Sequence, residues 1–177
     1  DHLLFVFALL LLVKGMRRIV ATVTAFTLAH SITLAGATLG WVHMPGPPIE
    51  ATIALSIAFV AAEILHSRQG RPGLTERYPW IVAFTFGLLH GFGFASALMQ
   101  VGLPQTEIPI ALLFFNVGVE VGQLLFIAAV FAAFWFVRRS TRRVNVPQIP
   151  WASAVPAYVI GSLAIFWVVQ RTVAFFP

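Results

Sequence analysis

Ionisable side chains recur at similar positions within long apolar stretches of this sequence. There are four such residues, and each lies 11 to 13 residues from a charged residue or a proline near one end of its stretch. They are His2, His30, His90 and Glu120. On ideal helices this separation corresponds to about 15–20 Å. We therefore expect the four side chains at a common depth in a membrane, where an ionisable group needs a partner.

Imidazole and carboxylate groups together suit a borderline divalent cation such as Ni²⁺, Co²⁺ or Zn²⁺. The chain has no cysteine, so no thiolate is present to hold a softer ion such as Cu⁺. Mg²⁺ and Ca²⁺ would require more carboxylates than the single buried Glu120. Asp1 is adjacent to His2, and their side chains diverge by about 100° if both are helical.

Uncharged polar residues accompany these candidates. Asn116, Glu120 and Gln123 follow an i, i+4, i+7 spacing, which places them on one helical face. Thr27 and Ser31 lie within one turn of His30. We assign Thr27, Ser31, Asn116 and Gln123 a supporting role. The alternative for all of them, and for the histidines, is hydrogen bonding that holds neighbouring helices together.

Other residues have expected roles away from this depth. Glu63 and His66 share a helical face close to Arg68, where a solvated cytoplasmic mouth or a salt bridge to Arg68 is expected. Small residues let helices approach closely in a membrane. We assign helix packing to five glycines: Gly87, Gly91, Gly93, Gly118 and Gly122.

Composition identifies the class of protein. The 177 residues are 59% hydrophobic and only 10% charged, with a mean hydropathy of +0.91. A soluble domain would carry roughly 25% charged residues, so the sequence predicts an all-α integral membrane protein. The net charge of +5 would suggest nucleic-acid binding in a soluble protein, but here its distribution indicates membrane topology instead.

The sequence predicts a single transmembrane domain of six helices in a bundle. We expect these helices at about residues 1–14, 18–41, 49–66, 79–101, 107–137 and 151–171. Ten of the eleven basic residues then fall on one side, and only Arg171 falls on the other. By the positive-inside rule the arginine-rich side is cytoplasmic, which places both ends of the chain on the periplasmic side.

The first apolar stretch is too short to cross a bilayer. From His2 to Lys14 it reaches about 18 Å, compared with a hydrocarbon thickness of roughly 30 Å. We expect the first helix to begin upstream of Asp1, in a chain truncated at its N-terminus. The alternative is a segment that does not span the membrane.

Four stretches resemble the HupE/UreJ family of bacterial membrane proteins, described as nickel/cobalt permeases. They are Asp1-His-Leu-Leu-Phe, Phe26-Thr-Leu-Ala-His-Ser-Ile-Thr-Leu, Leu89-His-Gly-Phe-Gly-Phe-Ala and Phe115-Asn-Val-Gly-Val-Glu-Val-Gly-Gln. The resemblance implies a six-helix transporter of the inner membrane. It also implies that five residues take part in metal passage: Asp1, His2, His30, His90 and Glu120.

The expected function is a permease for a transition-metal cation, with the ion passing a His/Glu/Asn site near the membrane midplane. The expected partners are the lipid bilayer and the metal ion, with a homo-oligomer or a membrane-complex partner left open and no nucleic acid. Two alternatives remain. One is an intramembrane zinc-dependent hydrolase built on the same histidines. The other is a structural or assembly subunit whose polar residues only join helices.

Overall fold

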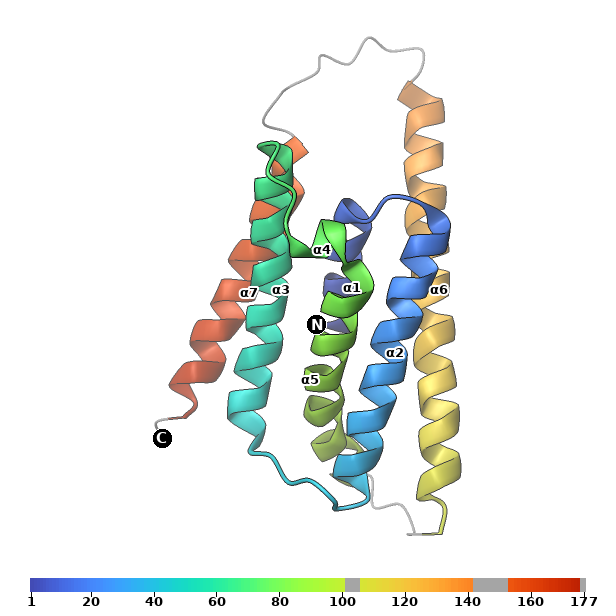
Figure 1. The fold of residues 1–177 in the computed structure, drawn as a ribbon, viewed down its shortest axis with the longest axis vertical. Coiled ribbons are helices and arrows are strands. Elements are labelled where there is room, and N and C mark those ends of the chain that lie inside the picture. The colour runs from blue at the N-terminus through green and yellow to red at the C-terminus, as the bar shows by residue number, and fades with distance from the viewer. Residues whose placement is uncertain (101–105, 142–152, 176–177) are drawn as a thin grey trace.

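The computed structural model describes residues 1–100, 106–141 and 153–175, and its described segments form helices with no strand among them (Figure 1). The helices are α1 (His2–Leu12), α2 (Met16–Thr38), α3 (Gly46–Arg68), α4 (Leu74–Arg77), α5 (Pro79–Gln100), α6 (Ile108–Thr141) and α7 (Val155–Val173). The predicted all-α fold is therefore confirmed.

Four of these helices, α2, α3, α6 and α7, are long and apolar enough to cross a membrane. The chain is thus a multi-pass membrane protein. Helix α1 is shorter, and so is the part of α5 whose side chains the structure describes, Pro79–Ala95. With 11 residues, α1 reaches about 17 Å, so a bundle of six spanning helices stays a prediction.

Helix α3 begins earlier than the proline-rich linker suggested. Pro47 and Pro48 lie in its first turn, where a missing backbone N–H leaves no intrahelical hydrogen bond unmade. At the other end of the chain, α7 begins at Val155 rather than at Trp151, which lies outside the described residues.

The loop after α3 contains a short helix, α4, that the sequence analysis did not anticipate. The carboxylate of Glu63 accepts hydrogen bonds from the backbone N–H groups of Leu74 (2.6 Å) and Thr75 (2.7 Å). These are N–H groups that the first turn of a helix leaves unpaired. Glu63 is only 7% exposed, so it anchors this loop instead of lining an open mouth, while His66 is exposed.

Helices α2 and α5 lie side by side at a very short distance. A Cβ atom on Gly87 would overlap the carbonyl oxygen of Phe26, and one on Gly91 would overlap the carbonyl oxygen of His30. Gly93 faces α3 instead, where a Cβ atom would come within 2.5 Å of Ile53 Cδ1. Gly87 and Gly91 therefore allow backbone contacts that a side chain would block, whereas at Gly93 the end of the Ile53 side chain could move aside.

The long helix α6 packs mainly on α2 and is otherwise largely exposed. Its 34 residues correspond to about 51 Å, which exceeds the hydrocarbon thickness of a bilayer. Gly118 and Gly122 have nothing within 4 Å of a Cβ position, so no helix among the described residues packs against them there.

One core joins five of the helices. It contains the fully buried side chains of Phe5 from α1, Phe26 from α2, Ile57 from α3, Ala83 from α5 and Ile160 from α7. The core therefore fixes the starts of α1 and α5 beside the middle of α2.

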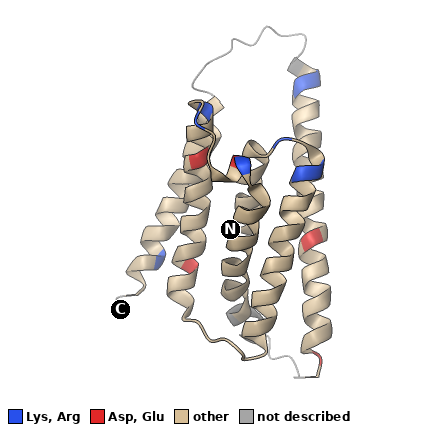
Figure 2. Cartoon of the chain, in the orientation of Figure 1, with Lys and Arg blue, Asp and Glu red and all other residues tan. Residues whose placement is uncertain are grey.

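Arginine and lysine residues gather at the end of the bundle that holds the α1–α2 turn, α4 and the basic ends of α3 and α6 (Figure 2).

Candidate metal-ligand site

Three histidines from three helices meet inside the bundle. His2 is in the first turn of α1, His30 is in α2 and His90 is in α5. The ring centroid of His2 lies 5.0 Å from that of His30 and 4.8 Å from that of His90. His30 and His90 are 0% exposed. The close approach of α2 and α5 at Gly91, next to His90 in sequence, brings their backbones together at this level.

Phenylalanine rings surround this histidine cluster. Phe26 contacts all three histidine rings, with centroid distances of 5.4 Å to His2, 6.2 Å to His30 and 5.1 Å to His90. Phe94 contacts His2 and His30, and Phe115 stacks on His30. The aromatic rings provide few hydrogen-bond partners, so the ring nitrogens depend on one another or on a ligand.

Several nitrogen atoms of the cluster have no hydrogen-bond partner among the described residues. They are Nε2 of His2, both Nδ1 and Nε2 of His30, and Nδ1 of His90. Buried polar atoms are normally paired, and each unpaired atom costs about 1–3 kcal/mol. Four buried ring nitrogens without a partner in one cluster indicate a ligand-binding site.

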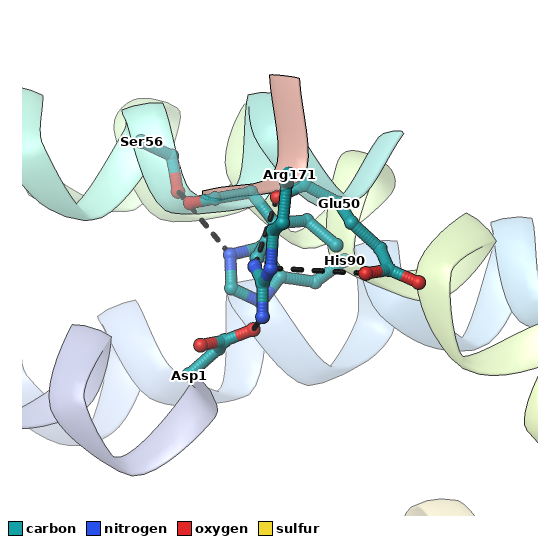
Figure 3. A network of polar contacts seen from close by, with 6 residues as sticks. Asp1, Glu50, Ser56, His90 and Arg171 are labelled. Atoms are coloured by element: carbon teal, nitrogen blue, oxygen red, sulfur yellow. Dashed lines mark hydrogen bonds and ion pairs between the residues drawn. The ribbon is translucent and has the colours of Figure 1, made fainter. Parts of the chain in front are cut away.

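The remaining nitrogen of His90 has a partner that indicates its tautomer. His90 Nε2 lies 3.2 Å from Ser56 Oγ, and the Ser56 hydroxyl donates its hydrogen to the Ile53 carbonyl oxygen at 2.7 Å (Figure 3). A hydroxyl that donates to Ile53 can only accept from His90, and this arrangement favours the tautomer with the proton on Nε2. Nδ1 of His90 is then the atom with a free lone pair.

Among the described residues, the hydrogen bonds of the polar α6 side chains go to other partners than the three histidines. Glu120 Oε1 accepts a hydrogen bond from Thr24 (2.7 Å), and Gln123 Oε1 accepts one from Thr27 (3.0 Å). Glu120 Oε2, Gln123 Nε2 and Asn116 Oδ1 are buried without a partner among the described residues. Ser31 donates to the backbone carbonyl of Thr27 (2.6 Å).

A cavity of about 730 Å³ lies beside the cluster. Five helices line it, and its polar residues are Asp1, His2, Glu50, Gln123 and Arg171. Gln123, rather than Glu120, is thus the polar α6 side chain on the cavity wall. A cation in this cavity would meet one histidine, one amide and two carboxylates.

Asp1 already has a cationic partner in this structure. Its Oδ2 atom accepts a hydrogen bond from Arg171 Nη2 at 2.8 Å, and each side chain is 21% exposed (Figure 3). Arg171 also donates to the backbone carbonyl oxygen of Glu50 at 2.9 Å.

The histidine cluster is not a finished coordination sphere. In the described part of the chain, no group of three or more histidine and acidic side chains is placed so that it could hold a metal ion as it stands. The three rings meet edge to face, at 86–88° for the two pairs that involve His2. Tetrahedral coordination would need ring nitrogens about 2.0–2.1 Å from the ion.

A comparison with protein-family models identifies the family of the chain. The model of the family described as "HupE / UreJ protein" matches residues 1–171. The chain belongs to the HupE/UreJ family. No curated protein and no solved structure matches it. Membership in the HupE/UreJ family makes the chain a membrane protein related to nickel and cobalt transport.

Two functional candidates in this HupE/UreJ protein were not singled out from the sequence. Ser56 is one of few polar residues in the apolar middle of α3, and that isolation was a usable signal. Arg171 was noted only as the single basic residue on its side of the membrane. Its contact with Asp1 joins residues 170 positions apart, which no local pattern indicates.

Proposed function

We propose that this protein passes a divalent transition-metal cation of the Ni²⁺/Co²⁺ type across the bacterial inner membrane. The central ligands are the imidazoles of His2, His30 and His90. The observation that supports this function is the convergence of three buried histidines from separate helices, with four ring nitrogens lacking a protein partner. Neutral imidazole is a preferred ligand of nickel, cobalt and zinc.

Oxygen ligands lie on either side of the cluster in this proposal. Asp1 and His2 line the cavity and receive the hydrated ion. Asn116 and Glu120 each have one buried oxygen atom without a partner among the described residues, and these atoms replace water as the ion passes α6. The Thr27 hydroxyl donates a hydrogen bond to Gln123 Oε1 at 3.0 Å, and this bond positions Gln123 in the cavity wall.

The membrane potential supplies a driving force for import. An inside-negative potential favours inward movement of a divalent cation by about 4.6 kcal/mol per 100 mV, at about 2.3 kcal/mol per charge. Arginine and lysine residues gather at one end of the described helices (Figure 2), and we assign this end to the cytoplasm. Both ends of the chain are then assigned to the periplasmic side. The sequence contains no phosphate-binding loop that would indicate ATP hydrolysis.

The structure favours transport over hydrolysis on the same histidines. A zinc hydrolase needs a carboxylate base beside the metal-bound water. Glu120 is hydrogen-bonded to Thr24 at 2.7 Å and is not among the residues that line the cavity. Asp1 and Glu50, which do line it, both lie beside Arg171.

Uptake of radiolabelled nickel and cobalt by cells or vesicles tests the proposal. His90→Ala removes a ring that contacts both His2 and the Ser56 hydroxyl. We expect uptake to fall by more than about tenfold, because loss of even an outer partner of a metal ligand costs about 10–100-fold. Glu120→Gln keeps the Thr24 contact but removes the charge, and a fall in uptake is expected there as well.

His43→Ala is the matched control, since His43 is exposed and lies in the linker after α2. This variant is expected to transport at the wild-type rate. Retained uptake in both His90→Ala and Glu120→Gln would refute the proposed function.

A further inference from the structure

The guanidinium group of Arg171 joins three helices at the edge of the cavity. Its Nη2 donates to Asp1 Oδ2 at 2.8 Å, its Nη1 donates to the Glu50 carbonyl oxygen at 2.9 Å, and its Nε lies 3.7 Å from Glu50 Oε2 (Figure 3). The group also lies 5.6 Å from the ring of Trp167. One cation from α7 is therefore shared between a residue at the start of α1 and one in α3.

The two carboxylates differ in how exposed they are. The side chain of Asp1 is 21% exposed, whereas that of Glu50 is 51% exposed. The contact with Asp1 is also the shorter one, at 2.8 Å compared with 3.7 Å. Attraction between charges strengthens as water is excluded, so the guanidinium interacts more strongly with Asp1.

Arg171 and an incoming cation would compete for the same carboxylate. Asp1 lines the cavity next to His2, and Arg171 lines the same cavity. A divalent cation bound to Asp1 would lie within a few ångströms of the guanidinium, where the repulsion between +2 and +1 charges is strong in a partly buried place. Binding at Asp1 thus requires the guanidinium to leave, and the Glu50 carboxylate is already within reach of its Nε.

We propose that Arg171 is an internal competitor for the metal ion: it occupies the Asp1 carboxylate when no cation is bound and transfers to Glu50 when one arrives. Glu50 is the acceptor that makes the exchange possible. The identity of the cation rests on the proposed function. Arg171 and Glu50 are positioning residues in this mechanism and do not themselves bind the ion.

Titration of the purified full chain with Co²⁺ tests the exchange, with the dissociation constant as the readout. Arg171→Gln removes the competitor, and we expect about tenfold tighter binding. Glu50→Gln removes the acceptor and leaves the guanidinium on Asp1, so binding is expected to weaken severalfold. A purely structural ion-pair network predicts instead that both variants weaken binding.

Arg171→Lys is the matched control, since it keeps the charge and is expected to bind Co²⁺ within about twofold of the wild type. If Arg171→Gln does not fold, Glu50→Gln is compared in the wild type and in Asp1→Asn. The exchange predicts severalfold weaker binding in the wild type and a change of less than about twofold in Asp1→Asn, whereas a structural network weakens binding in both. Weaker binding by a folded Arg171→Gln, or unchanged binding by Glu50→Gln, overturns the proposal.

Asp1→Asn separates direct competition from a general effect of charge on the cavity. In this background, Arg171→Gln is expected to change the dissociation constant by less than about twofold, because no carboxylate is left to compete for. A tenfold effect that persists in Asp1→Asn overturns the proposal.

The same titration distinguishes failure of the exchange from failure of the proposed function. Co²⁺ binding that does not depend on His90 but follows the expected Arg171 pattern contradicts only the proposed function. Binding that depends on His90 but not on Arg171 contradicts only the exchange. Absence of Co²⁺ binding in both the wild type and Arg171→Gln contradicts both.

Discussion

Unpaired nitrogen atoms are the most informative feature at the scale of single residues. A neutral imidazole has one N–H donor and one lone pair, and burial without partners for either is unfavourable. In His90 the Ser56 hydroxyl accepts from Nε2 and leaves Nδ1 as the acceptor. A hydroxyl on α3 therefore decides which nitrogen on α5 can bind a cation.

Ser56→Ala tests this role of the hydroxyl. Without its acceptor, His90 loses the hydrogen bond that selects the tautomer with a free Nδ1, so Co²⁺ affinity should fall by about tenfold or more. Ser56→Thr keeps a hydroxyl and should restore most of the affinity. The matched control is Thr52→Ala on the same helix, since the Thr52 hydroxyl contacts only its own helix, at the Pro48 carbonyl. Equal affinity in Ser56→Ala and the wild type would contradict the tautomer assignment.

At the scale of helices, the contact between α2 and α5 positions two of the three histidines. Gly91 follows His90 directly, and a Cβ atom on it would overlap atoms of His30, Thr33 and Leu34 on α2. Small residues four positions apart allow this approach in a membrane, where no hydrophobic effect drives helices together. The distance between the His30 and His90 backbones thus depends on the absence of a single methyl group.

Gly91→Ala should disrupt both the packing and the site. The added Cβ atom would overlap the Thr33 hydroxyl and the His30 carbonyl oxygen, and overpacking of this kind costs about 1–3 kcal/mol. We expect a lower melting temperature in detergent together with weaker Co²⁺ binding. Gly118→Ala is the matched control, because nothing lies within 4 Å of a Cβ atom there. Equal melting temperatures in the two variants would show that the close approach of α2 and α5 is wrong.

At the scale of the whole molecule, charge is distributed asymmetrically along the helix axes. The arginine-rich end contains Lys14, which lies 3.4 Å from Glu76, and Arg18, which donates to backbone carbonyls of α4. The opposite end contains Arg171, whose charge is offset by Asp1 and Glu50. The uncompensated positive charge is therefore at one end only, which is the pattern that sets orientation in membranes.

Labelling of introduced cysteines tests this orientation, and the natural absence of cysteine makes the background clean. Gln69→Cys lies after α3 at the arginine-rich end, and Val42→Cys lies in the linker at the opposite end. In intact bacterial cells opened only at the outer membrane, a membrane-impermeant maleimide should label Val42→Cys and spare Gln69→Cys. In inverted inner-membrane vesicles the result should reverse. The opposite pattern would contradict periplasmic ends of the chain.

The sequence determined the class of protein and its long apolar helices, and it predicted a shared depth for the histidines. Apolar runs of sufficient length specify membrane helices through the cost of unpaired backbone groups in lipid. Counting residues from helix ends then places side chains by depth, because the rise per residue is constant. The meeting of His2, His30 and His90 is consistent with this count.

Only the tertiary structure decided which side chains face one another. Helices that are apolar on every side carry little pattern to indicate their rotation, so Glu120 and Gln123 could not be assigned to different surroundings in advance. Ser56 and Arg171 became candidates only when α3 and α7 were packed against α5 and α1. Depth follows from local geometry along one helix, whereas pairing depends on the packing of several helices, and that packing is set by contacts far apart in sequence.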